Sequence, residues 1–285
     1  MGKYRAYRRD CQERREIERR MSTGQDRLWL PLLYERLMDH FGPRLWWPVT
    51  PEEGGEPQYS GGPRTDTQRL EVMLGAILAQ NTAWRGAARA LGNLYSAGLV
   101  DFQHLLEVPL EQLAPLLRPS GYFNQKALKI QALVRFINER FGLSWQDLLR
   151  VETAALRQLL LGVRGIGPET ADCIVLYAAC QPTFVIDSYT RRLLHRLGWA
   201  AENESYGSLK ARFEAACARD TLLYQEFHAL LDRQCVVYCL KRAPRCDECP
   251  LADICARTGV RTAATVGAAD AKRFGNLERG SHEQP

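Results

Sequence analysis

The sequence has neither a long apolar run nor a stretch in which apolar and polar residues alternate. The first absence excludes a membrane-spanning helix, which needs about 20 consecutive apolar residues. The second argues against a sheet, because half-buried strands alternate with a period of two. The chain also lacks a secretory signal, and its nine cysteines cannot all pair. We therefore expect an all-α protein with reduced thiols in the cytoplasm.

The apolar content is sufficient for a sizeable core. Hydrophobic residues make up 46% of the 285 residues, and the formal net charge of +5 is compatible with a nucleic-acid partner. Apolar residues recur at helical spacing over residues 28–41, 67–80, 83–97, 101–106, 110–117, 124–140, 145–150 and 151–160. We expect a charged extension over residues 1–26, with a DNA-contacting arm as the alternative, and a flexible tail over residues 258–285.

Four cysteines lie close together near the C-terminus, separated by six, two and five residues: Cys239, Cys246, Cys249 and Cys255. Four thiolates suit either a tetrahedral zinc ion or a 4Fe-4S cluster. The spacing favours the cluster, because zinc sites usually come as two close pairs and only one close pair is present. Four buried thiols are the remaining alternative. Three cations accompany the set, Lys241, Arg242 and Arg245, and indicate contact with phosphates.

A second motif covers residues 163–172. Gly165 and Gly167 permit a tight turn with an exposed backbone, and Pro168 favours the start of another helix. Exposed amides at a helix N-terminus bind anions, so a DNA phosphate fits there whatever the base sequence. An ordinary helical corner is the alternative.

Asp187 follows three apolar residues and precedes a helical segment. Aspartate is a favoured N-cap residue, and a carboxylate at this position is equally suited to catalysis. Both interpretations stay open from the residues alone. Two histidines, His195 and His228, are expected to be packing residues.

The hairpin, Asp187 and the cysteine spacing together resemble the endonuclease III superfamily of helix-hairpin-helix DNA glycosylases over about residues 70–255. The resemblance implies an all-α, two-lobed fold, a double-stranded DNA partner carrying a damaged base, and a 4Fe-4S cluster on the four cysteines in place of zinc. It implies a six-helix barrel over residues 68–181 and an iron–sulfur domain formed by residues 27–67 and 182–257. We further expect a monomer in the cytoplasm, associated with the nucleoid.

The resemblance also assigns roles to single residues. Asp187 matches the catalytic aspartate, which would stabilise positive charge on the sugar and orient the attacking water once the base has left the stack. Gln80 and Tyr122 match residues that fill the vacated space. Phosphate contacts are expected from Gly165, Gly167, Arg191, Arg192, Lys241, Arg242 and Arg245.

Glu169 departs from the pattern of the bifunctional members, which carry a lysine at this position. Schiff-base chemistry needs an amine, so we expect a monofunctional glycosylase with weak or absent AP lyase activity. Lys126 and Lys129 are the alternative amines.

The substrate class follows from the 3-methyladenine glycosylase branch, which the chain resembles through its tryptophan pair and hairpin. That branch would place Trp46, Trp47, Glu169 and Asp187 around the base. Aromatic rings would select a cationic alkylated purine by a cation–π effect of about 0.5–2 kcal/mol. For the two tryptophans, the alternative is a position in the hydrophobic core. For the function of the protein, the alternatives are a glycosylase for oxidised or mismatched bases and a non-catalytic iron–sulfur DNA-binding protein.

Overall fold

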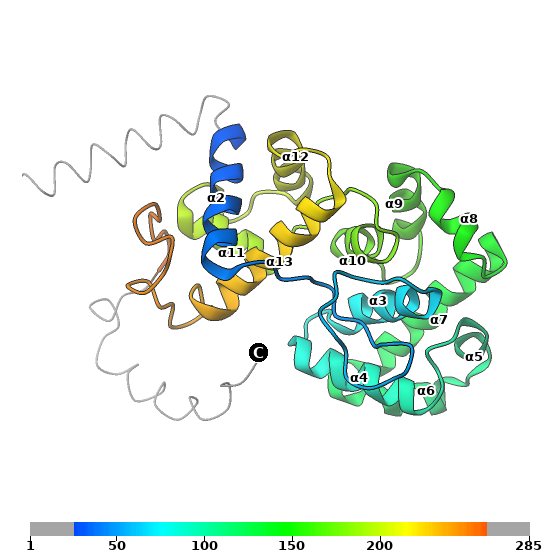
Figure 1. The fold of residues 1–285 in the computed structure, drawn as a ribbon. Coiled ribbons are helices and arrows are strands. Elements are labelled where there is room, and N and C mark those ends of the chain that lie inside the picture. The colour runs from blue at the N-terminus through cyan, green and yellow to red at the C-terminus, as the bar shows by residue number, and fades with distance from the viewer. Residues whose placement is uncertain (1–25, 261–285) are drawn as a thin grey trace, which may run out of the picture.

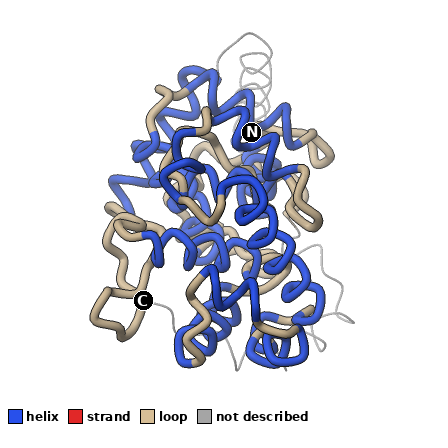
Figure 2. The backbone as a smooth tube through the Cα atoms, turned by 90° about the vertical axis from the view of Figure 1, so that its right-hand side faces the viewer, coloured by secondary structure: helices blue, strands red, loops and turns tan. Residues whose placement is uncertain are grey.

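The computed structural model describes residues 26–260. The predicted extension and almost all of the predicted tail lie outside these residues. The described part is helical, and its one β-type contact is the isolated bridge between Val49 and Gln58 (Figure 2). The predicted all-α class is confirmed.

The predicted helices agree with the observed ones to within a few residues at each end. The first half of the chain contains α2 (Asp26–Phe41), α3 (Asp66–Leu78), α4 (Trp84–Ser96), α5 (Phe102–Glu107), α6 (Leu110–Leu116), η1 (Arg118–Ser120) and α7 (Phe123–Phe141). The second half contains α8 (Trp145–Arg150), α9 (Thr153–Leu161), α10 (Pro168–Cys173), η2 (Ile174–Ala178), α11 (Ser188–Leu197), α12 (Tyr206–Ala216) and α13 (Thr221–Val237).

The helices form two lobes (Figure 1). One lobe runs from α3 to α10, and the other combines α2 with α11, α12, α13 and the cysteine-rich loop that follows. Helix α2 joins the C-terminal helices because it packs against α12 and α13. Two ion pairs hold it there: Arg212 binds Asp26 at 2.8 Å, and Arg36 binds Asp253 in the cysteine-rich loop at 2.6 Å. The exact domain limits stay a prediction.

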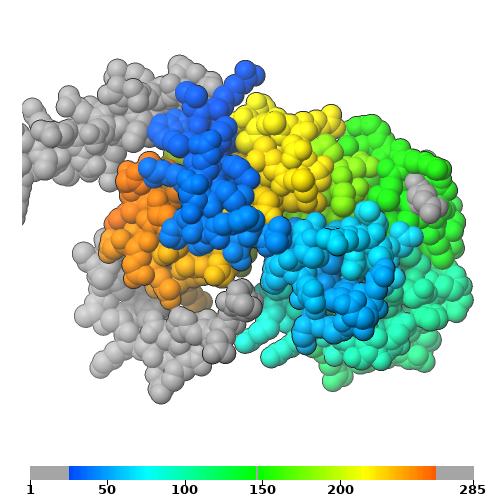
Figure 3. Space-filling model, viewed as in Figure 1, coloured from blue at the N-terminus to red at the C-terminus, as the bar shows by residue number. Residues whose placement is uncertain are grey.

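The segment between α2 and α3 crosses from one lobe to the other and lies on α3 (Figure 3). Its anchor is Glu71, a fully buried acid of α3. The Glu71 carboxylate accepts hydrogen bonds from the amide and the hydroxyl of Thr50, both at 2.8 Å, and from the Tyr95 hydroxyl at 2.9 Å. Three donors offset the cost of burying this acid, so the tryptophan-bearing segment has a defined position.

The predicted hairpin lies between α9 and α10. Gly165 has φ +88°, a conformation that side-chain-bearing residues rarely adopt. Gly167 occupies the N-cap position and Pro168 begins α10. The fully buried Asp172 then ties α10 to the other lobe by accepting from Tyr206 of α12 at 2.7 Å, and to the neighbouring α9 by accepting from Arg157 at 2.8 Å. This anchoring fixes the hairpin relative to the rest of the site.

Candidate active site and cysteine centre

Asp187 caps α11, and its carboxylate remains half exposed. One carboxylate oxygen accepts a hydrogen bond of 2.7 Å from the Thr190 amide. The residues before it, 183–186, are buried, so the chain leaves the core at this carboxylate. The N-cap interpretation is therefore confirmed. The half exposure leaves the carboxylate accessible for chemistry as well.

Two residues of α13 approach the same carboxylate. The ring nitrogen of His228 and the carboxyl oxygens of Asp187 and Asp232 all lie within 4.8 Å of one another. Sequence reasoning gave His228 only a packing role and missed Asp232. The spacing of four between them on one helix face was the available signal, but nothing in the sequence shows which face of α13 meets Asp187.

Glu169 shares the electrostatic environment of Asp187. The surrounding protein desolvates the Glu169 carboxyl, the charge of Asp187 acts in the same direction, and together they raise its pKa to about 7. Arg191 opposes this shift. The residue as a whole is nevertheless exposed. One helical turn later, burial and then the charge of Glu169 raise the pKa of Cys173.

The two tryptophans occupy different environments. Trp47 is 3% exposed and packs so closely on α3 that a Cβ at Gly75 would lie 2.9 Å from its ring. Trp47 also contacts Tyr177, with ring centroids 5.4 Å apart, and Tyr177 reaches His228. Trp46 is half-buried against Trp84 at 5.0 Å. Trp47 thus belongs to the core behind the site, and a stacking role for either ring stays a prediction.

The two predicted wedge residues also differ in their surroundings. Gln80 is bound to the hairpin, because its amide donates to Thr170 Oγ1 at 2.8 Å and to the Gly165 carbonyl at 3.3 Å. Lys129 donates to the other end of the same Gln80 amide. Tyr122 is 73% exposed and lies in the left-handed region with φ 46°. The Tyr122 side chain therefore faces solvent, whereas the Gln80 amide is bound to the hairpin, and insertion of either residue into a duplex stays a prediction.

Both alternative lysines donate hydrogen bonds within the protein, Lys126 to more partners than Lys129. Lys126 is 2% exposed, and its Nζ donates to the Leu78 carbonyl at 2.8 Å, the Thr82 hydroxyl at 3.0 Å and the Ser120 carbonyl. Burial lowers its pKa to about 8, and the charge of Lys129 contributes. Lys126 thus holds together the loops that carry Gln80 and Tyr122.

The predicted phosphate-binding cations divide into bound and exposed groups. Arg192 donates to the Cys239 carbonyl at 2.9 Å, and Arg191 donates to the Glu204 carbonyl at 2.6 Å. Both guanidinium groups are therefore bound to carbonyl oxygens of the protein, and their predicted phosphate contacts stay a prediction. The cations of the cysteine-rich loop, Lys241, Arg242 and Arg245, are exposed.

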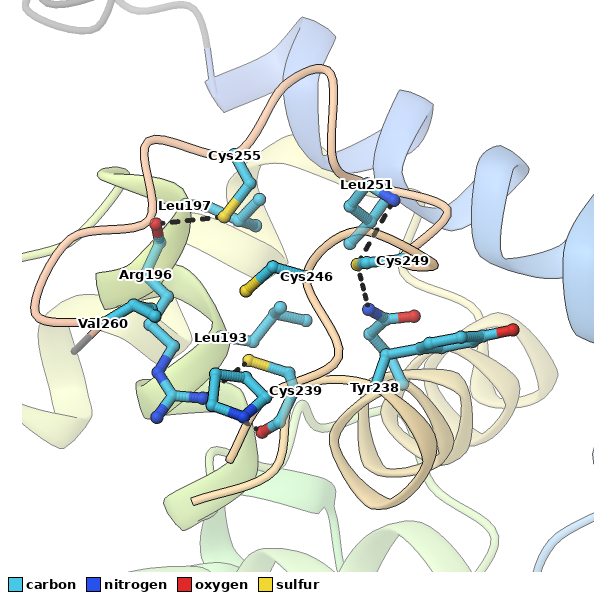
Figure 4. A pocket seen from close by; sticks show the side chains of 12 residues that line it. Leu193, Arg196, Leu197, Tyr238, Cys239, Cys246, Cys249, Leu251, Cys255 and Val260 are labelled. Carbon is cyan, nitrogen blue, oxygen red and sulfur yellow. Dashed lines mark hydrogen bonds between the residues drawn. The ribbon is translucent and has the colours of Figure 1, made fainter. Parts of the chain in front are cut away.

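The four cysteines line one cavity, and their side chains point into it (Figure 4). Within the described residues, no three of their sulfurs lie within 4.8 Å of one another. A tetrathiolate zinc ion with bonds of 2.3 Å would hold its sulfurs about 3.8 Å apart, whereas a cubane with a ligand at each corner holds them farther apart. Four convergent thiols suit a metal centre of either kind, and the 4Fe-4S cluster stays a prediction. Arg196 and the amide of Gln234 approach Cys239 and Cys249 at 3.3 and 3.0 Å, as expected for donors to thiolates.

Comparisons with known proteins agree with this fold and site. Residues 74–219 match the model of the HhH-GPD superfamily base excision DNA repair protein. A protein of Methanocaldococcus jannaschii that is named as a DNA repair glycosylase is 36% identical over 225 residues, covering 78% of this chain and 94% of its own length. Endonuclease III of Sulfolobus acidocaldarius is 28% identical over 65% of this chain and 80% of its own.

Solved structures show the same architecture. A crystal structure of the H. pylori 3-methyladenine DNA glycosylase bound to 1,N6-ethenoadenine has a TM-score of 0.57 at 26% identity, over 73% of this chain and 95% of that one. A non-covalent endonuclease III–DNA complex has a TM-score of 0.64 at 18% identity, over 81% and 95% of the two chains.

The fold and the hairpin next to an acidic site define a DNA repair glycosylase. The chain belongs to the HhH-GPD superfamily of base excision DNA repair proteins. The two-lobed helix-hairpin-helix fold expected from the sequence is confirmed. None of the described helices has the length and apolarity needed to cross a membrane.

Proposed function

We propose that the protein is a monofunctional DNA glycosylase that binds damaged duplex DNA and hydrolyses the N-glycosidic bond of alkylated purines. The observation that carries the proposal is the position of Asp187, a half-exposed carboxylate fixed by the Thr190 amide and close to the hairpin residue Glu169. Breaking the glycosidic bond develops positive charge on the sugar, and this carboxylate would stabilise it. The same group would orient and deprotonate the attacking water.

The amines near the site support the proposal that AP lyase activity is weak or absent. Position 169 holds a carboxylate, and Lys126 is buried and bound to carbonyl oxygens. Lys129 donates to Gln80. A Schiff base needs a free amine within reach of the sugar, so hydrolysis would leave an intact abasic site.

The substrate class is supported by charge. Glu169 and Asp187 place two carboxyls near the reacting base, and this favours a base that carries positive charge. N3- and N7-alkylated purines are such bases, and their glycosidic bonds are already weakened. The similarity to the 3-methyladenine glycosylase, at 26% identity, supports the same class.

The cysteine centre would hold a 4Fe-4S cluster through Cys239, Cys246, Cys249 and Cys255. When bound, such a cluster fixes the loop that displays Lys241, Arg242 and Arg245 and serves a structural role or a redox-sensitive one. The chain's own contribution is a set of donors around the thiols and cations on the outside of the loop. Phosphate contacts from these cations would position the duplex independently of sequence.

A panel of duplexes, each with one lesion, tests the proposal. We expect release of free base from N3- or N7-alkylated purines and an abasic strand that breaks only on later treatment with alkali. Release of oxidised or mismatched bases alone would contradict the alkylated-purine assignment and identify a glycosylase for those lesions instead.

A further inference from the structure

Two buried polar atoms beside Asp187 have no hydrogen-bond partner among the described residues. They are Nε2 of His228, a residue only 4% exposed, and Oδ1 of Asp232. Both side chains come from α13, one turn apart, and each lies within 4.8 Å of the other and of the Asp187 carboxylate. Buried polar atoms are rarely left without a partner, and one hydrogen on Asp232 would provide the missing donor.

The opposite side of the His228 ring determines where its hydrogen lies. The Tyr177 hydroxyl is 3.1 Å from the Gln225 carbonyl oxygen and 2.8 Å from His228 Nδ1. A carbonyl can only accept, so the hydroxyl donates to Gln225 and His228 Nδ1 donates to the Tyr177 oxygen. Burial lowers the pKa of His228 although the charge of Asp187 opposes this, which favours a neutral ring whose Nε2 is an acceptor near the two carboxyls.

Two carboxyls at this separation do not both ionise easily, and they share a proton. Burial is the largest of the effects that raise the pKa of Asp232, and the charge of Asp187 and a hydrogen bond with it add to the shift. Asp187 is half-exposed and already accepts the Thr190 amide. The proton therefore belongs on Asp232, which can donate it to His228 Nε2 or to the Asp187 carboxylate, one acceptor at a time.

We propose that Asp232 is a positioning residue that keeps one proton in the cluster with Asp187 and His228 and so holds the Asp187 carboxylate oriented toward the reacting sugar. The inference rests on the proposed function of Asp187. Loss of the shared proton would leave two adjacent negative charges, which would turn Asp187 away. Further titratable or charged groups influence this cluster from the elements packed around it: Glu169 and Cys173 from α10, Tyr177 from η2, and Tyr189 and Arg192 from α11.

Two substitutions separate a proton-holding role from packing. Asp232→Asn keeps the shape and an N–H donor but cannot ionise, whereas Asp232→Leu keeps much of the volume and removes the donor. We would measure single-turnover base release on an alkylated-purine duplex across the pH range, together with DNA affinity. Wild-type release is expected to fall at alkaline pH. Asp232→Asn should stay within about threefold at neutral pH and lose the alkaline fall, and Asp232→Leu should drop by about tenfold with unchanged DNA affinity.

The controls keep the inference distinct from the proposed function. The Glu169→Gln variant removes the titration of the Glu169 carboxyl near pH 7, so that this titration is not mistaken for that of the Asp232 cluster. If Asp187→Asn abolishes release but both Asp232 variants keep the wild-type pH profile, the inference is overturned and the proposed function stands. If the wild-type protein releases no base, the proposed function fails.

A readout without activity decides the inference even in that case. Infrared spectroscopy of the folded Glu169→Gln protein, which lacks the carboxyl that titrates near pH 7, should show a protonated-carboxyl band at neutral pH that a further Asp232→Asn removes and a further Asp253→Asn does not. Asp253 is an exposed carboxylate paired with Arg36 and is the matched control. Absence of such a band in the Glu169→Gln protein would contradict the shared proton.

Discussion

The Lys126 ammonium group donates a 2.8 Å hydrogen bond to the carbonyl oxygen of Leu78, the last residue of α3. Together with the bond to the Ser120 carbonyl, this contact commits the amine to the protein interior. To attack a sugar, this lysine would first have to release these partners. The contact therefore bears directly on whether the enzyme cleaves the strand.

Borohydride trapping on abasic-site DNA tests the missing amine. The wild-type protein should give no abundant covalent adduct, because position 169 holds a carboxylate and both nearby lysines are hydrogen-bonded. Glu169→Lys places an amine at the hairpin and should gain a trapped adduct. A wild-type adduct that disappears in Lys129→Gln would show that another lysine performs the chemistry.

The raised pKa of Glu169 predicts a pH-dependent preference for cationic bases. Glu169 ionises around pH 7 rather than near 4.5, so its charge is absent below pH 6 and present above pH 8. The ratio of kcat/KM for an N7-alkylated guanine to that for a neutral lesion should rise about fivefold across this interval. Glu169→Gln should flatten the ratio. An equally steep rise in the variant would assign the effect to another group.

The same pKa predicts a trend in stability. Because folding raises the Glu169 pKa, the folded state binds this proton more tightly than the unfolded state does. The contribution of this carboxyl to the free energy of unfolding is therefore fully present below about pH 4.5 and is lost as the pH rises through about 7. Denaturant unfolding should show the wild-type protein losing stability relative to Glu169→Gln over this range. A difference that does not change with pH would contradict the assignment.

Gly165 is predicted to be irreplaceable for two separate reasons. Its φ of +88° strains any side chain, and an added Cβ would lie 2.4 Å from Cγ of Lys129. Gly165→Ala should cost about 1–3 kcal/mol, displace Lys129 from Gln80 and weaken binding to undamaged duplex. Gly98→Ala is the matched control, since Gly98 has φ +67° and open space around the added carbon. It should lose stability and keep DNA affinity; equal affinity loss in both would point to general unfolding.

Loss of the cysteine centre should affect stability and DNA binding together. We expect about four iron atoms per chain, and Cys249→Ala should lower iron content, Tm and DNA affinity. The dependence of affinity on salt should also weaken, because each lost phosphate contact lowers the slope by about 0.9. Cys217→Ala, outside the set, should leave all of these unchanged. Stoichiometric zinc in place of iron would contradict the assignment.

The sequence predicts the elements better than it predicts the contacts between them. Helical periodicity is local, and the residues it selects in α3, such as Leu70 and Met73, are buried. The turn at Gly165 is also a local property of the backbone. Lys126, by contrast, looks like an ordinary surface lysine, and its burial is explained by the carbonyl groups at the ends of α3 and η1, of which the one from α3 is distant in the sequence.

The candidate site shows the same limit. Asp187 was found through its position at the head of a helix, which is a local signal. Asp232 was missed, because its importance depends on how α13 packs against α11. The buried position of Trp47 likewise depends on the space left by Gly75, a residue far away in the sequence.

The most direct test compares the wild-type protein with Asp187→Asn in a single-turnover assay of free-base release from a duplex with one alkylated purine. Because asparagine keeps the shape but cannot stabilise the developing charge, release should fall at least about 100-fold while DNA affinity is retained. Release by the variant at the wild-type rate would contradict the central role assigned to this carboxylate.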